Sequence, residues 1–230
     1  MPKIVSIFLL YFLMFAFVAC TNTEKPSDEQ TSATKSSPAT PVKTVKNILI
    51  FGNSLTAGYG LEPSESYPAQ LQNRLDSLKL PYKIVNAGVS GETTSGGNSR
   101  LDWVLKNPVD IFILELGGND GLRGIPATET RKNLQSMIDK VKAKYPKAKI
   151  VLAGMQVPPS MGKKYADEFK VIYPELAQKN KVELIPFLLE NVGGEVKLNQ
   201  KDGIHPNAIG AKIVAENVWQ VLEGMLEKGV

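Results

Sequence analysis

The sequence predicts an α/β fold in which helices cover both faces of a parallel sheet. Two observations lead to this prediction. From residue 45 onward, short apolar runs alternate with longer segments of helical period, and three of the runs are nearly continuous in Ile, Val and Leu. Continuous apolar runs are typical of strands buried on both faces. Strict alternation of strand and helix implies right-handed crossovers and helices on both sides of the sheet.

The elements follow from the same periodicities. We expect strands at residues 45–51 (VKNILIF), 82–87 (YKIVNA), 109–116 (VDIFILEL), 149–154 (KIVLAG) and 182–187 (VELIPF). Apolar residues at helical spacing predict helices at residues 67–78, 99–106, 127–145, 165–180 and 207–228. Glycine and proline mark the joints between them. We therefore place one domain at residues 45–230, since about 185 residues suit a single domain of this class.

The residues before this domain have the pattern of an export signal. Residues 1–19 contain a lysine near the start, an apolar stretch from Ile4 to Val18 and then a small alanine. This is the arrangement of a secretory signal peptide. The apolar stretch is shorter than the roughly 20 residues that span a bilayer comfortably, although an uncleaved anchor is the alternative.

Cys20 is the only cysteine of the chain, so no internal disulfide can form. The sequence FVAC resembles a bacterial lipobox, in which the cysteine becomes the first mature residue and carries lipid, although Phe17 departs from the usual leucine. Residues 20–44 are rich in Ser, Thr and Pro, which is typical of a disordered tether. We expect an exported bacterial lipoprotein, anchored in the membrane through Cys20 and facing the periplasm or the cell surface.

Composition argues against several other classes of function. The formal net charge is a modest +4, and the lysines of residues 140–149 have the spacing of a solvated helix face, so we expect no nucleic-acid partner. One histidine and one cysteine cannot build the usual zinc site. The candidate loops offer only Glu92, Asp120 and Asp202 as carboxylates for a harder cation. P-loop, G-x-G-x-x-G and G-x-S-x-G motifs are absent, and we expect neither a metal nor a cofactor.

Polar residues gather in the loops that follow the predicted strands. In an open parallel sheet, ligands bind beyond the carboxyl ends of the strands, where these loops meet. Ser54 follows the first strand, and it is a candidate for either a helix N-cap or a nucleophile. His205, the only histidine, lies three residues after Asp202. A carboxylate at that range can orient the imidazole to accept a proton from a serine. The alternative is a helix entry, with Asp202 as the cap and Pro206 in the first turn.

The segments GNSL, GVSGETT, LGGND and DGIHPN, in this order, resemble the motifs of the SGNH hydrolase family, also called GDSL esterases. The resemblance implies a flavodoxin-like three-layer α/β/α sandwich with five parallel strands. It implies Ser54 as nucleophile, with His205 as base and Asp202 as the carboxylate that orients it. It also implies an oxyanion hole formed by the backbone N–H groups of Ser54 and Gly91 and the side-chain amide of Asn119.

One residue departs from the family pattern. Asn53 stands where the family has the aspartate of GDSL, which is not a member of the triad. Asn53 can still accept hydrogen bonds but carries no charge. We therefore expect the catalytic mechanism of the family to be retained while the electrostatics of the loop change.

Within the family, the chain is most similar to the bacterial periplasmic thioesterase, lysophospholipase and arylesterase subgroup. The resemblance implies hydrolysis of aryl esters, acyl thioesters or lysophospholipids through an acyl-serine intermediate, without a cofactor. The alternatives are a carbohydrate O-deacetylase and a catalytically silent surface lipoprotein that binds glycan or lipid. For an acyl chain we expect a groove with the following apolar lining: Leu122, Ile125, Val157, Pro158 and Met161.

Overall fold

The computed structural model describes residues 44–227 of the chain. The signal peptide predicted at residues 1–19, Cys20 and nearly all of the tether predicted at residues 20–44 lie outside the described residues. No helix between residues 44 and 227 is long and apolar enough to cross a membrane.

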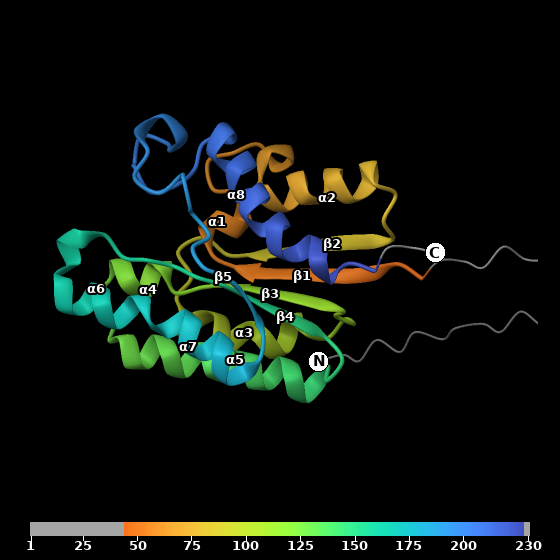
Figure 1. Ribbon diagram of the computed structural model, residues 1–230, viewed down its shortest axis with the longest axis horizontal. Helices are drawn as coiled ribbons and strands as arrows, with labels where there is room; N and C mark the ends of the chain where they lie inside the picture. Colours follow the sequence, from red (N-terminus) through yellow and green to blue (C-terminus); the bar gives the residue numbers. More distant parts are fainter. Residues whose placement is uncertain (1–43, 228–230) are drawn as a thin grey trace, which may run out of the picture. The chain divides into compact units, whose positions relative to one another are not determined.

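The described residues contain a sheet of five parallel strands in the order β2-β1-β3-β4-β5 (Figure 1). The strands are β1 (Lys46–Gly52), β2 (Tyr82–Gly88), β3 (Ile111–Glu115), β4 (Lys149–Ala153) and β5 (Glu183–Ile185). This is the flavodoxin-like order, so the predicted fold class is confirmed. The chain moves from β1 to one side of the sheet and then returns to the other side, so that β1 and β3 flank the switch point where such folds bind ligands.

Helices cover both faces of the sheet (Figure 1). The helices are α1 (Ser54–Ala57), α2 (Tyr67–Ser77), α3 (Thr94–Val104), α4 (Gly118–Leu122), α5 (Ala127–Lys144), α6 (Lys163–Lys170), α7 (Ile172–Asn180) and α8 (Ala208–Leu222). On one face α2 packs against α8, and on the other α5 packs against α3 and α7. The core lies between these layers, and every residue of β3 is buried.

Two helices differ from the sequence prediction for identifiable reasons. Helix α3 begins at Thr94 instead of Ser99, because the Thr93 side chain caps the helix by accepting a hydrogen bond from the Gly96 N–H. The helix predicted at residues 165–180 is divided into α6 and α7. Pro174 explains the break, since proline has no N–H to donate and its ring clashes with the carbonyl four residues earlier.

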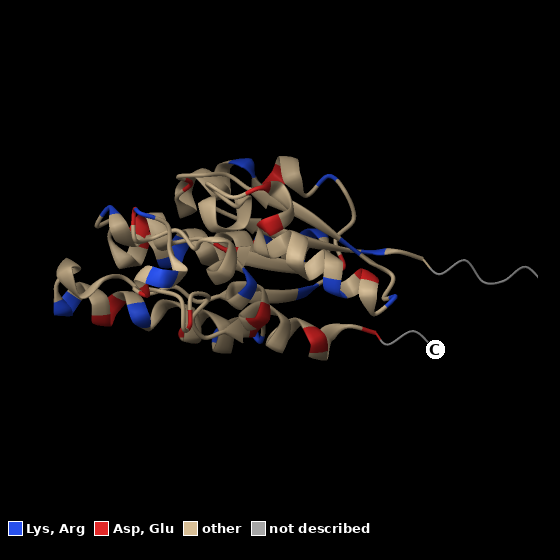
Figure 2. Cartoon of the chain, turned by 90° about the horizontal axis from the view of Figure 1, so that it is seen from above, with Lys and Arg blue, Asp and Glu red and all other residues tan. Residues whose placement is uncertain are grey.

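Basic and acidic positions are intermixed along the helices in the view of Figure 2. Several of them form ion pairs across neighbouring elements, such as Lys140 with Asp102 at 3.0 Å. Arg74 of α2 and Glu216 of α8 pair in the same way. Exposed pairs of this kind contribute little to the free energy of unfolding, typically about 0.2–1 kcal/mol, so the apolar core carries most of the stability.

Candidate active site

Ser54 lies at the carboxyl end of β1, at the first position of α1, and only 7% of it is exposed. The N-cap of this helix is Asn53, whose side-chain oxygen accepts a hydrogen bond from the Leu55 N–H at 2.9 Å. Ser54 is therefore not the helix cap that its position in the sequence allowed. Its hydroxyl has a long contact of 3.4 Å with the Asn53 side-chain oxygen and a shorter one with another part of the chain.

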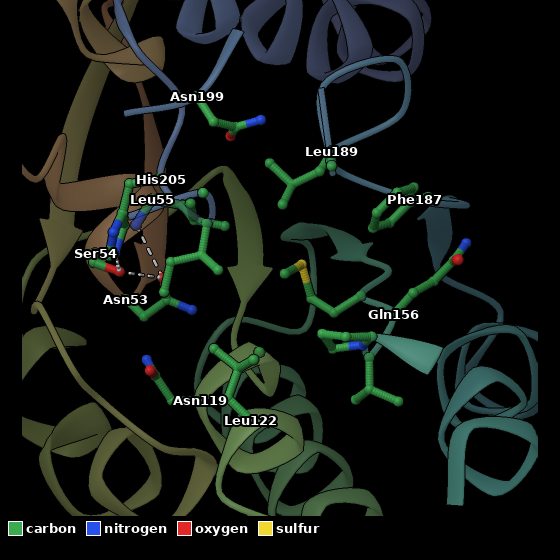
Figure 3. A pocket seen from close by; sticks show the side chains of 18 of the residues that line it. Asn53, Ser54, Leu55, Asn119, Leu122, Gln156, Phe187, Leu189, Asn199 and His205 are labelled. Carbon is green, nitrogen blue, oxygen red and sulfur yellow. Dashed lines mark hydrogen bonds between the residues drawn. The ribbon is translucent and has the colours of Figure 1, made fainter. Parts of the chain in front are cut away.

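That partner is His205. The Nε2 atom of His205 lies 2.9 Å from Ser54 Oγ, and Nδ1 lies 2.8 Å from Asp202 Oδ2 (Figure 3 shows Ser54 and His205). The hydrogen bond from His205, followed by that from the Ile204 N–H, lowers the pKa of Asp202 to about 2. An ionised carboxylate can only accept, so Nδ1 carries a proton and donates it to Asp202. Nε2 is then unprotonated and accepts a hydrogen bond from the Ser54 hydroxyl.

The local turn around Asp202 supports this arrangement. The other carboxylate oxygen, Oδ1, accepts from the N–H groups of Ile204 at 3.0 Å and His205 at 3.1 Å. Helix α8 is capped by Asn207, whose side chain accepts from the N–H groups of Ile209 and Gly210. The helix-entry alternative for Asp202 is therefore wrong, because Asn207 takes the capping role.

The loop that contains Gly91 is bonded to α4, which follows β3. Asn119 is in the first turn of α4, and its Nδ2 donates to the Glu92 carbonyl at 3.0 Å, which holds the loop containing Gly91 against α4. A second amide hydrogen of Asn119 remains available. Gly91 has φ = +78°, which favours glycine, and its carbonyl accepts from Arg123 Nη2 at 2.9 Å. Asn119 lines the cavity beside Ser54, whereas Gly91 is not one of its lining residues.

The Gly91 loop has a second support that sequence reasoning missed. The Glu92 carboxylate is buried and pairs with Arg100 of α3 at 2.5 and 2.6 Å. Arg100 also donates to the Ala87 carbonyl at 2.8 Å and lies 4.0 Å from the centroid of the Phe51 ring. The loop between β2 and α3 is thus fixed to both of the elements it joins.

Glu115 is a second residue that the sequence prediction missed. It ends β3, is 0% exposed and accepts hydrogen bonds from the Asn53 N–H (3.0 Å), Asn53 Nδ2 (2.8 Å) and Thr56 Oγ1 (2.7 Å). Burial raises the pKa of Glu115 to about 7, and the hydrogen bonds from Asn53 and Thr56 limit the rise. The Asn53 amide can donate to Glu115, which an ionised aspartate at this position could not do. Glu115 therefore anchors both sides of the turn that carries Ser54.

A cavity of about 440 Å³ opens next to Ser54 and His205 (Figure 3). Its size is within the range of pockets that bind small molecules. Its large apolar lining residues are Leu55, Leu122, Met155, Val157, Phe187, Leu189 and Ile204. The predictions of Leu122, Val157 and Pro158 as lining residues are confirmed.

Two predicted lining residues, Ile125 and Met161, are not part of this wall. Met161 instead faces the loop after α4, where its Cε would lie 3.8 Å from a Cβ on Gly124. Met155 and Phe187 were not among the predicted lining residues, and they come shortly after the carboxyl ends of β4 and β5. The rule that ligands bind beyond these strand ends could have found both residues.

Among residues 44–227, no group of three or more His, Cys, Asp or Glu side chains is placed to hold a metal ion. The carboxylates of this region already have partners. Glu92 pairs with Arg100, Glu115 accepts from Asn53 and Thr56, and Asp202 accepts from His205. The arrangement around Ser54 therefore consists of hydrogen-bonded side chains and an adjoining apolar cavity.

Comparison with known proteins identifies relatives for this arrangement. Residues 50–213 match the model of the GDSL-like Lipase/Acylhydrolase family. The chain is 40% identical to Esterase TesA of Pseudomonas aeruginosa over 182 residues, which cover 79% of this chain and 90% of that protein. It is 38% identical to Thioesterase 1/protease 1/lysophospholipase L1 of Escherichia coli K12 over 180 residues, or 78% and 84% of the two chains. The crystal structure of TesA superposes with a TM-score of 0.75 at 40% identity, covering 79% of this chain and all of that one.

Proposed function

Because the chain belongs to the GDSL-like lipase/acylhydrolase family and is an esterase, we propose that Ser54 is its nucleophile, with His205 as general base. Asp202 is the carboxylate that orients His205. The observation that carries this assignment is the unbroken series of hydrogen bonds from Ser54 Oγ through the imidazole to Asp202. Nucleophile and base within hydrogen-bond reach, with the base oriented by a third group, are the signature of an activated serine.

The proposed reaction has two steps. His205 Nε2 takes the Ser54 proton as Oγ bonds to the carbonyl carbon, and it then delivers this proton to the leaving alcohol or thiol as the ester bond breaks. Water attacks the resulting acyl-serine, again losing a proton to Nε2, and the acid is released when Ser54 recovers its proton. The oxyanion formed in each step is stabilised by the N–H groups of Ser54 and Gly91 and by the Asn119 amide. Donors placed in advance in this way supply a large part of the rate enhancement.

We propose an acyl ester or thioester as the substrate, with its chain in the apolar cavity. The support is the position of Phe187 and Leu189 on the side of the cavity away from Ser54 (Figure 3). A longer acyl chain bonded to Ser54 would bury its methylene groups against these side chains. Each buried methylene group stabilises a complex by about 0.8 kcal/mol. Aryl esters, acyl thioesters and lysophospholipids are all substrates of this kind.

The substrate proposal is tested with p-nitrophenyl esters from acetyl to palmitoyl, and with a thioester and a lysophospholipid. We expect kcat/KM to rise from acetyl to medium-length acyl groups. Leu189→Ala should lower kcat/KM roughly 10-fold for the octanoyl ester, since apolar contacts with the chain are lost. Its kcat/KM for the acetyl ester should not change, and this is the internal control. A preference for acetyl esters that is insensitive to Leu189→Ala would contradict the proposal and favour a carbohydrate O-deacetylase.

We also propose that the enzyme is an exported lipoprotein anchored through Cys20. The support is the sequence of residues 1–20, which lie outside the described part of the chain. In a bacterial host, the wild-type protein should incorporate labelled fatty acid and partition into detergent. Cys20→Ser should abolish incorporation and change partitioning or processing, whereas the tether variant Ser27→Ala should behave as wild type. Equal labelling of the Cys20→Ser and wild-type proteins would refute the anchor.

A further inference from the structure

The ring of Tyr59 packs against the imidazole of His205. The ring centroids are 4.7 Å apart and the planes are inclined by 40°. This separation is within the 4.5–7 Å range of attractive aromatic pairs. Tyr59 is nevertheless 53% exposed, so core packing does not explain its position.

The backbone of Tyr59 is fixed by Ser54 itself. Gly58 has φ = +77°, and this left-handed residue ends α1 so that the N–H groups of Gly58 and Tyr59 both donate to the Ser54 carbonyl at 3.0 Å. This is the hydrogen-bonding pattern of a helix that ends in a left-handed glycine. The same short turn therefore places the Ser54 hydroxyl at one end of the imidazole and the Tyr59 ring against its face.

Gln200 ties this turn to the loop that carries His205. Its side-chain Nε2 donates to the carbonyls of Tyr59 at 2.7 Å and Pro206 at 3.0 Å. Its backbone N–H donates to the His205 carbonyl at 2.7 Å. Because one residue bonds to both segments, the contact between Tyr59 and His205 is built into the backbone arrangement of the two loops.

Few charged groups surround His205. The side chains that line the two cavities bordering it include no carboxylate and no lysine or arginine, and the titratable residues among them are Tyr59, Tyr67 and His205 itself. Asp202 is the carboxylate in contact with the imidazole, and Tyr67 is engaged with Thr56. When His205 takes the Ser54 proton, the resulting imidazolium therefore has Asp202 at one edge and an aromatic ring on its face. An aromatic face attracts a cation by about 0.5–1 kcal/mol at exposed sites.

We propose that Tyr59 is a positioning residue that holds the imidazole of His205 between Ser54 and Asp202 and stabilises its protonated form during the reaction. The inference rests on the proposed role of His205 as general base. Because the ring interacts more strongly with the cation than with the neutral imidazole, it stabilises the transition state more than the ground state. Such an interaction raises kcat and leaves KM nearly unchanged.

The test compares Tyr59→Leu with Tyr59→Phe by measuring kcat and KM on a short-chain aryl ester across the acidic and neutral pH range. Tyr59→Leu retains apolar bulk but loses the ring, so we expect kcat to fall about 5-fold with little change in KM. The midpoint of the acid limb of the kcat/KM profile should move about half a pH unit lower, since the cation is less stabilised. Tyr59→Phe retains the ring and should match the wild type in both respects.

Three results would overturn this role. The first is a wild-type kcat and pH profile for Tyr59→Leu, and the second is an equal loss in the Phe and Leu variants, which would implicate the hydroxyl. The third is a lower kcat accompanied only by a lower melting temperature, with the midpoint unmoved, which would indicate a purely structural contact. His205→Ala is measured in parallel. If that variant remains active, the proposed function itself fails; if it is inactive while Tyr59→Leu behaves as wild type, only the role of Tyr59 fails.

Discussion

Ser54→Ala and His205→Ala are each expected to reduce kcat about 10⁴- to 10⁶-fold while the protein stays folded. Ser54→Ala removes the atom that forms the acyl-enzyme. His205→Ala removes the base, whose Nε2 lies 2.9 Å from Ser54 Oγ. The chain has no other histidine to replace that base. The double variant should be little worse than either single one, because groups that act as a unit are strongly non-additive.

The measurement is kcat/KM on a short-chain aryl ester, with circular dichroism to confirm folding and a fluorophosphonate probe to report the reactivity of Ser54. Asp202→Asn should have a smaller effect on kcat/KM, because it weakens the orientation of His205 without deleting the base. A folded His205→Ala protein that kept a tenth of wild-type activity would show that another base is at work.

The pH dependence of activity provides a second check on the same residues. Its hydrogen bonds lower the pKa of Asp202 to about 2. The carboxylate therefore stays ionised, and able to accept the hydrogen bond from His205, until the pH falls through about 2. A loss of activity at mildly acidic pH therefore does not report protonation of Asp202. Burial raises the pKa of Glu115 to about 7, so Glu115→Gln is the variant that removes the titration of this carboxyl from the pH profile.

Asn119→Ala is expected to lower kcat roughly 10²- to 10³-fold with a small effect on KM, because the amide would interact mainly with the oxyanion of the transition state. Asn119 also donates to the Glu92 carbonyl, so movement of the Gly91 loop is a second route to a lower kcat and needs a control. Arg123→Ala is the matched control: Arg123 donates to the carbonyl of Gly91 in the same loop. The kcat of Arg123→Ala should fall by no more than a few-fold.

Comparable losses in Asn119→Ala and Arg123→Ala would assign the effect to the loop and not to a hydrogen bond with the oxyanion. Wild-type turnover by a folded Asn119→Ala protein would remove Asn119 from the mechanism altogether. The two variants are compared on the same aryl ester, with kcat and KM determined separately, because only loss of a transition-state contact lowers kcat while KM is retained.

The sequence by itself determined the sheet and the segment that carries His205. Three of the strand positions followed from nearly continuous apolar runs, which depend only on burial of each segment. Asp202 and His205 are three residues apart in one short turn, so their contact is a local property of the chain. Ser54 could be placed at the same edge of the sheet, because the loops after parallel strands meet there.

Only the tertiary structure decided which residues, far apart in the sequence, support the loops at this edge of the sheet. Glu115 lies 62 residues from Asn53 along the chain, and Gln200 lies 141 residues from Tyr59. Neither contact leaves a periodic pattern or a fixed spacing in the sequence, because each depends on how two loops are aligned after the sheet has formed. The same is true of the choice of Asn53 over Ser54 as cap, since Asn53 is selected by its contact with buried Glu115 on the neighbouring strand. Local periodicity encodes the elements, whereas the partners of polar side chains in loops are determined by packing between elements that are far apart in sequence.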